Sequence, residues 1–235
     1  MLNTLRALVF AGLSLTAVQS HAQYVPIDFT SQTFNSMNIT AGYLLNKSML
    51  DGASAQAAKP APVSKQVATT TSGNSNVAHE LAQSFPESDR AAAEESFSKL
   101  LQAFAQLESS LGVAHGDAAV AMACLVIGSY EAYHDETLDP ATYKPVISQL
   151  QNAMAKDASF AGLDAGVRRA QYERMAILGM YVLATRDTLR RQPSANRTNE
   201  LRQAAAGYLR QLQLDPETMS IDESGIEVGD EPTVP

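Results

Sequence analysis

The sequence predicts an all-α fold, an irregular five- to six-helix bundle around a central apolar helix, preceded by a signal peptide and a flexible N-terminal arm. Two observations lead to this prediction. Residues 118–127 carry no polar side chain except the thiol of Cys124, and a helix that is apolar all round must be enclosed by protein or lipid. These ten residues cannot cross a bilayer, which needs about 20. Several other segments repeat apolar residues at helical spacing, so they are expected to surround this helix.

The first 22 residues have the order of a secretory signal peptide. Arg6 supplies the positive charge, residues 7–18 are an apolar stretch, and Ser20 and Ala22 place small side chains three and one residues before a cut. We predict cleavage after Ala22 and a periplasmic or extracellular location. An uncleaved anchor is the alternative, but the apolar stretch is too short to span, so we expect no stable membrane anchor after cleavage.

Two segments of different character follow the signal peptide. Residues 23–50 form an arm whose start alternates apolar residues, as an extended segment does, and whose end has weakly helical spacing. Docking of the arm on the bundle and mobility of the arm both remain open. Residues 51–76 consist largely of Ala, Ser, Thr, Gly, Pro and Lys, and bury too little apolar surface to offset the entropy of ordering. We predict a disordered linker over 51–76.

The helical bundle domain is predicted over residues 77–228, with a disordered tail over 229–235. Its first helix covers residues 77–85 with Asn76 as N-cap. Pro86 opens the second helix, which Gly112 ends. An apolar stripe runs along this second helix at intervals of three and four residues. The stripe consists of Phe97, Leu100, Leu101, Phe104, Leu107 and Leu111.

The central helix begins at Asp117, whose charge suits the positive end of the helix dipole, and ends by Asp135. Asp139 is the predicted N-cap of the next helix. The longest helical pattern covers residues 164–191, and its middle is again apolar on most sides. A last helix begins at Asn196 or Thr198. From Glu217 the chain is acidic, with three apolar residues that are expected to hold part of it against the surface: Ile221, Ile226 and Val228.

Glycines within the two most apolar helices predict close contact between these helices. Gly128 and Gly179 each cost about 0.5–1 kcal/mol relative to alanine, so each needs a compensating reason. Each lies in a stripe of residues three or four apart. The stripes are Ala121, Cys124, Gly128 and Ala132 on one helix, and Tyr172, Ala176, Gly179 and Leu183 on the other. We predict that the two stripes face each other.

Charge and cysteine content exclude several classes of function. Cleavage after Ala22 leaves 16 basic and 25 acidic residues, a formal charge of −9, without a cluster of basic residues. Such a chain repels phosphate backbones and anionic headgroups, so we expect no nucleic-acid partner. Cys124 is the only cysteine, which excludes an intramolecular disulfide, and its apolar surroundings favour a buried, unreactive thiol.

Four motifs together resemble a family of secreted bacterial proteins, the domain of unknown function numbered 6683. The first is residues 118–133, which end in G-S-Y-E-A-Y, and the second is Tyr143-Lys144-Pro145 with Leu150 after it. The third is residues 171–180 (Q-Y-E-R-M-A-I-L-G-M), and the fourth is residues 204–212 followed by Leu214-Asp215-Pro216. The resemblance covers about residues 77–228. It implies a secreted helical domain with no assigned chemistry, and it indicates no catalytic residues.

The strongest candidates for chemistry are Glu131, His134 and Glu173. A Glu-x-x-His pair on each of two helices, with a Glu from each of two others, forms a di-iron carboxylate site. Here Glu131 and His134 form one such pair and Glu173 could add a carboxylate, but the second pair is missing. A solvated helix end is therefore favoured over a metal site, and no cofactor is predicted. Combinations of Ser, His and Asp occur in any chain of this size and decide nothing.

Two classes of function fit the sequence. The first is a non-enzymatic interaction or structural module of the bacterial envelope, with an unknown envelope protein as partner. The second is a small enzyme or metal-binding protein with a polar site near the end of the central helix. The lack of a complete catalytic motif favours the first class. The catalytic residues, the ligand and the oligomeric state are not predicted.

Overall fold

The computed structural model describes residues 76–156, 160 and 162–229. The described elements are α4 (Val77–Ala82), α5 (Arg90–Leu111), α6 (Ala118–His134), a 3₁₀ turn (Pro140–Thr142), α7 (Tyr143–Lys156), α9 (Ala165–Arg191), α10 (Ala195–Gln211), β1 (Met219–Asp222) and β2 (Gly225–Val228). The all-α prediction is confirmed, with one small hairpin added. The predicted signal peptide, arm, nearly all of the linker and nearly all of the tail lie outside the described residues.

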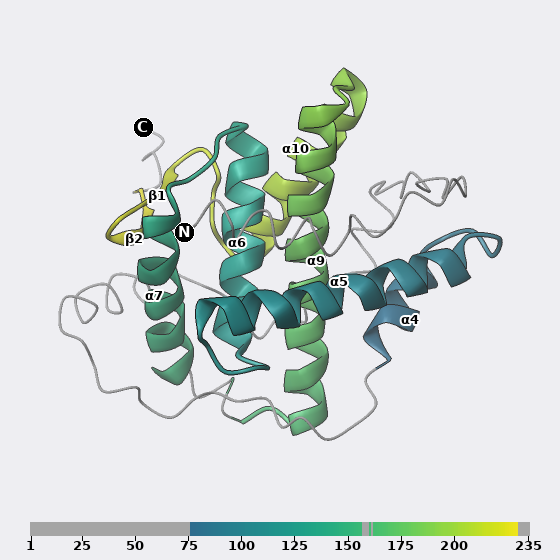
Figure 1. Ribbon diagram of the computed structural model, residues 1–235. Coiled ribbons are helices and arrows are strands. Elements are labelled where there is room, and N and C mark those ends of the chain that lie inside the picture. The colour runs from purple at the N-terminus through teal and green to yellow at the C-terminus, as the bar shows by residue number, and fades with distance from the viewer. Residues whose placement is uncertain (1–75, 157–159, 161, 230–235) are drawn as a thin grey trace, which may run out of the picture.

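Helix α6 is the centre of the bundle, as predicted. Of its 17 residues 15 are buried, from Ala118 to Ala132. The Asp117 side chain caps its start by accepting hydrogen bonds from the amides of Ala119 and Val120. Helices α7, α9 and α10 pack against α6, and α5 crosses in front of α9 at a steep angle (Figure 1). Within the described residues, none of the helices combines the length and the apolarity needed to cross a membrane.

The predicted contact between the two glycine stripes is confirmed. A Cβ atom added at Gly179 would lie 2.8 Å from the Cys124 sulfur and 2.8 Å from the Leu125 amide nitrogen. A Cβ atom added at Gly128 would lie 3.1 Å from Leu183 Cγ and 3.4 Å from the Gly179 carbonyl oxygen. The absence of side chains at these two positions therefore allows α6 and α9 to approach closely.

Helix boundaries differ from the prediction at three places. Helix α4 ends at Ala82, three residues before the predicted end. Helix α5 begins at Arg90 and not at Pro86, because the residues before it form a separate turn in which the Asp89 amide donates to the Pro86 carbonyl at 2.8 Å. Asn76 precedes α4 without capping it through its side chain. Helix α10 begins at Ala195, slightly before the predicted start.

The hairpin β1–β2 was not predicted, although Ile221 and Ile226 were expected to hold this segment against the bundle, and both are buried. These two residues face each other across the antiparallel pair. The Gln149 amide of α7 closes the outer edge of β2: its Nε2 donates to the Ile226 carbonyl at 2.8 Å, and its Oε1 accepts from the Ile226 amide at 2.6 Å. Gly225, with φ 118°, leaves room for this side chain. The hairpin is thereby attached to α7.

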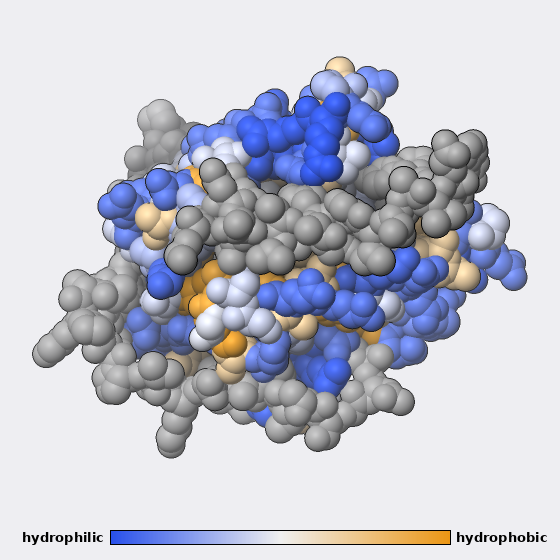
Figure 2. Space-filling view, in the orientation of Figure 1, coloured by the Kyte–Doolittle hydropathy of each residue, from blue (hydrophilic) through white to orange (hydrophobic). Residues whose placement is uncertain are grey.

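Most of the coloured residues on the face shown in Figure 2 are hydrophilic. Apolar residues gather beside the C-terminal end of α5, next to α7. Leu107 and Leu111 at this end of α5, and Val113 just after it, are partly buried and pack against the core.

Candidate functional site

The first polar cluster lies at the C-terminal end of α6 and contains Glu131, which is 1% exposed. Its Oε2 pairs with the Arg186 guanidinium of α9 at 2.8 Å. Its Oε1 accepts from the Leu138 amide at 2.9 Å and from the Tyr143 hydroxyl at 3.3 Å. One carboxylate thus connects α6, the following loop, α7 and α9.

Arg186 completes this cluster from the side of α9. It is buried, and besides Glu131 it donates to the Glu136 carbonyl and, at 3.0 Å, to the Thr137 hydroxyl. The opposite charges of Arg186 and Glu131 therefore balance each other within the protein, and the two Nη atoms of Arg186 bond three protein oxygens, which lowers the cost of burying the pair. The cluster fixes the loop between α6 and α7 against α9.

The structure does not bring Glu131, His134 and Glu173 together as a metal site. His134 Nε2 lies 3.0 Å from the Pro216 carbonyl oxygen, so the ring donates to the segment before β1. Glu173 pairs with Arg169 one turn earlier on α9, at 2.7 Å. Across residues 76–156, 160 and 162–229, no three Asp, Glu, His or Cys side chains are placed to hold a metal ion.

The second polar cluster lies where α5 passes into α6, and its residues were not predicted from the sequence as a candidate site. Its centre is Glu108, which is fully buried in the last turn of α5. Tyr172 of α9 donates to its Oε2 at 3.0 Å and the Gly116 amide to its Oε1 at 3.0 Å. Burial raises the pKa of the Glu108 carboxyl, and these donors oppose the rise.

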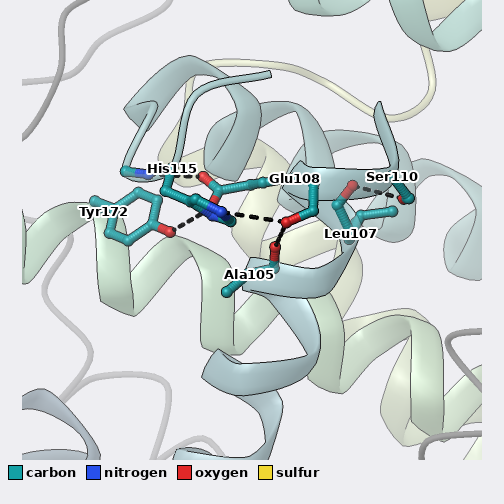
Figure 3. A network of polar contacts seen from close by, with 8 residues as sticks. Ala105, Leu107, Glu108, Ser110, His115 and Tyr172 are labelled. Atoms are coloured by element: carbon teal, nitrogen blue, oxygen red, sulfur yellow. Dashed lines mark hydrogen bonds and ion pairs between the residues drawn. The ribbon is translucent and has the colours of Figure 1, made fainter. Parts of the chain in front are cut away.

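His115 extends the second cluster to the surface (Figure 3). Its Nδ1 lies 3.2 Å from Glu108 Oε2, and its Nε2 lies 3.2 Å from Ser109 Oγ. The His115 side chain is 58% exposed, and Ser109 is exposed as well. A hydroxyl, an imidazole and a buried carboxylate are thus linked in series. In the sequence, this cluster is indicated only by the pair Glu108-Ser109 at the end of a predicted helix, with His115 three residues after Gly112, which ends that helix.

Cys124 is buried against α9, and burial raises its pKa to about 12. A thiol with this pKa stays protonated at neutral pH, so it is not a nucleophile. The prediction that Cys124 is buried is therefore confirmed.

Over the described residues, the fold is a helical bundle around the buried helix α6, with a small hairpin attached to α7. The chain belongs to the family of unknown function DUF6683, which matches residues 12–229. The family resemblance of the four motifs is thereby confirmed, and the match extends further towards the N-terminus than the motifs do, across the predicted arm and linker. No curated protein and no solved structure matches the chain.

Proposed function

We propose that this protein is exported to the bacterial envelope and that its helical bundle acts there as an interaction or structural module whose main role is binding, not catalysis. One observation carries the proposal: the candidate residues at the end of α6 are occupied in holding the fold. Glu131 accepts from a buried arginine, a backbone amide and a tyrosine. Three of the roughly four acceptor sites of this carboxylate are used in this way, which leaves little capacity for a metal ion or a substrate.

Export is supported by the order of charged, apolar and small residues in the first 22 positions. Fractionation of cells followed by mass spectrometry tests it. The protein should be recovered from the periplasm or the medium with Gln23 at its N-terminus. Recovery from the cytoplasm, or an exported chain that still begins at Met1, would contradict this part of the proposal.

The binding role is tested by cross-linking in cells. A photo-reactive residue is placed at Gln102 on α5, at Gln151 on α7 or at Gln203 on α10, of which the first and last are exposed. A binding module should give an adduct of defined mass at one face and none at the others. No adduct at any of the three positions would contradict the proposal.

The alternative, a metal site at the end of α6, is tested by elemental analysis of the mature protein. We expect no stoichiometric iron, zinc or manganese. One or two metal ions per chain that are retained in His79→Ala but lost in the double variant His134→Ala, Glu173→Gln would favour the alternative.

A further inference from the structure

His115 is the one described histidine whose ring joins a hydroxyl to a carboxylate. Nε2 lies 3.2 Å from Ser109 Oγ and Nδ1 lies 3.2 Å from Glu108 Oε2. In contrast, His79 meets a carboxylate and an amide side chain, and His134 meets a backbone carbonyl. Serial contact of hydroxyl, imidazole and carboxylate is the arrangement of a serine nucleophile with its base and the group that orients the base.

From this geometry we propose that Ser109, His115 and Glu108 form an acyl-transfer site that hydrolyses carboxylic esters. Ser109 is the nucleophile, His115 the general base and acid, and Glu108 the positioning residue. The activity is additional to the binding role proposed above and does not depend on it.

Glu108 is held in place by one group on α9 and one in the loop between α5 and α6. Tyr172 and the Gly116 amide each donate to it at 3.0 Å, and its carboxylate is fully buried. A carboxylate fixed beside Nδ1 favours the tautomer with the proton on Nδ1. Nε2 of His115 then presents a lone pair towards Ser109, as a general base must.

Access to the site is open. Ser109 and His115 are both exposed, so an ester can reach the nucleophile without movement of the fold. In the resting structure the Ser109 hydroxyl also lies 3.0 Å from the Ala105 carbonyl, and rotation about one bond turns its proton towards His115. The backbone amides of Ala114 and His115 have no acceptor among the described residues, and within this proposal we assign them as the oxyanion donors.

The reaction is balanced by water alone. Ser109 Oγ attacks the ester carbonyl carbon while its proton passes to His115 Nε2. The bond between this carbon and the alcohol oxygen breaks, and the leaving alcohol takes the proton from Nε2. Water then attacks the acyl group on Ser109 by the same route, releasing the carboxylic acid and restoring the serine.

The test uses the full mature chain with p-nitrophenyl acetate and a fluorophosphonate. We expect the fluorophosphonate to modify Ser109, as located by peptide mass spectrometry. Ser109→Ala and His115→Ala should each lower ester hydrolysis on the order of 100-fold, within the range of a lost nucleophile or base. Ser110→Ala is the matched control, because Ser110 is exposed and bonds a helix carbonyl, as Ser109 does.

Glu108→Gln separates positioning from folding. It should lower hydrolysis at least tenfold while the helical circular dichroism is unchanged, since glutamine keeps one acceptor oxygen. Modification of a different serine, an unmodified folded chain, or hydrolysis that persists in Ser109→Ala would overturn the proposal. These outcomes leave the binding role untouched, because its tests use other positions.

Discussion

Arg186 carries one charge of the buried ion pair, and its removal would leave the Glu131 carboxylate buried without a countercharge. Loss of one partner of such a pair costs about 3–5 kcal/mol. We expect Arg186→Met to lower the free energy of unfolding by about this amount in urea denaturation. The control is Arg191→Met, which removes an ion pair of α9 with an exposed arginine and should cost about 0–1 kcal/mol. If both variants lost the same free energy of unfolding, the buried pair of Arg186 and Glu131 would not be more important for stability than an exposed one.

Glu108 should make stability depend on pH. Burial raises its pKa above 4.5 in the folded state, so the protonated form is favoured by folding. The stability contributed by this shift is present below the unfolded value and is lost as the pH rises through the folded value. Urea denaturation between about pH 4 and pH 7 should therefore show a smaller decline for Glu108→Gln than for the wild type. If the free energy of unfolding declined equally with pH in the variant and the wild type, Glu108 would not be the source of the pH dependence.

At the residue scale, the sequence predicted the role of a side chain where its hydrogen-bond partner is close in sequence. Asp117 and Asp139 were predicted at helix starts, and each side chain accepts from amides two or three residues ahead. The Glu131–Arg186 pair was not predicted, because its members lie 55 positions apart and meet only through the packing of α6 on α9. The same holds for Tyr172 and Glu108.

The contact between α6 and α9 distinguishes its two glycines. A Cβ atom at Gly179 would meet backbone atoms of Cys124 and Leu125, which cannot shift cheaply, whereas the closest atom to one at Gly128 belongs to the flexible Leu183 side chain. We expect Gly179→Ala to lower the free energy of unfolding by about 1–3 kcal/mol, as overpacking does. Gly128→Ala should change it less, because the gain in helix propensity opposes the crowding. A Gly179→Ala variant as stable as the wild type would contradict close packing here.

The attachment of the hairpin to α7 is tested with Gln149→Leu. Leucine cannot bond the amide and the carbonyl of Ile226, and an unpaired buried polar group costs about 1–3 kcal/mol. We expect a lower midpoint in thermal denaturation and faster proteolytic cleavage within residues 215–229. Gln102→Leu, at an exposed position of α5, serves as control and should leave both measurements unchanged.

At the element scale, periodicity predicted the long helices because each buries one continuous stripe or its whole surface. The hairpin was not predicted because each of its strands has only four residues and because Gln149, which bonds to it, belongs to a helix far away in the sequence. In β1 the apolar residues Met219 and Ile221 alternate with polar ones and are buried, and this alternation in the sequence is typical of a strand. The sequence analysis expects Ile221 to hold the tail against the bundle, but it assigns no strand to this segment.

For the whole molecule, we expect residues 76–229 to fold without the preceding segment. The described core is continuous from Val77 of α4 to Ile226 of β2. A chain beginning at Asn76 should keep its helical circular dichroism and unfold cooperatively. A further truncation after Leu214 removes the hairpin and should destabilise this chain. Loss of structure on removal of residues 23–75 alone would show that the arm, which the family match includes, is part of the fold.

The enclosure of α6 has a practical consequence for finding a partner. Amide protons of a helix covered on all sides exchange with deuterium only when the molecule opens globally. Their exchange rate therefore reports the stability of the entire domain from a single peptide. A ligand that binds the native state slows this exchange wherever it binds, by an amount set by its concentration relative to its dissociation constant. Deuterium uptake of residues 118–132 can thus screen envelope extracts or compound collections before any binding surface is known.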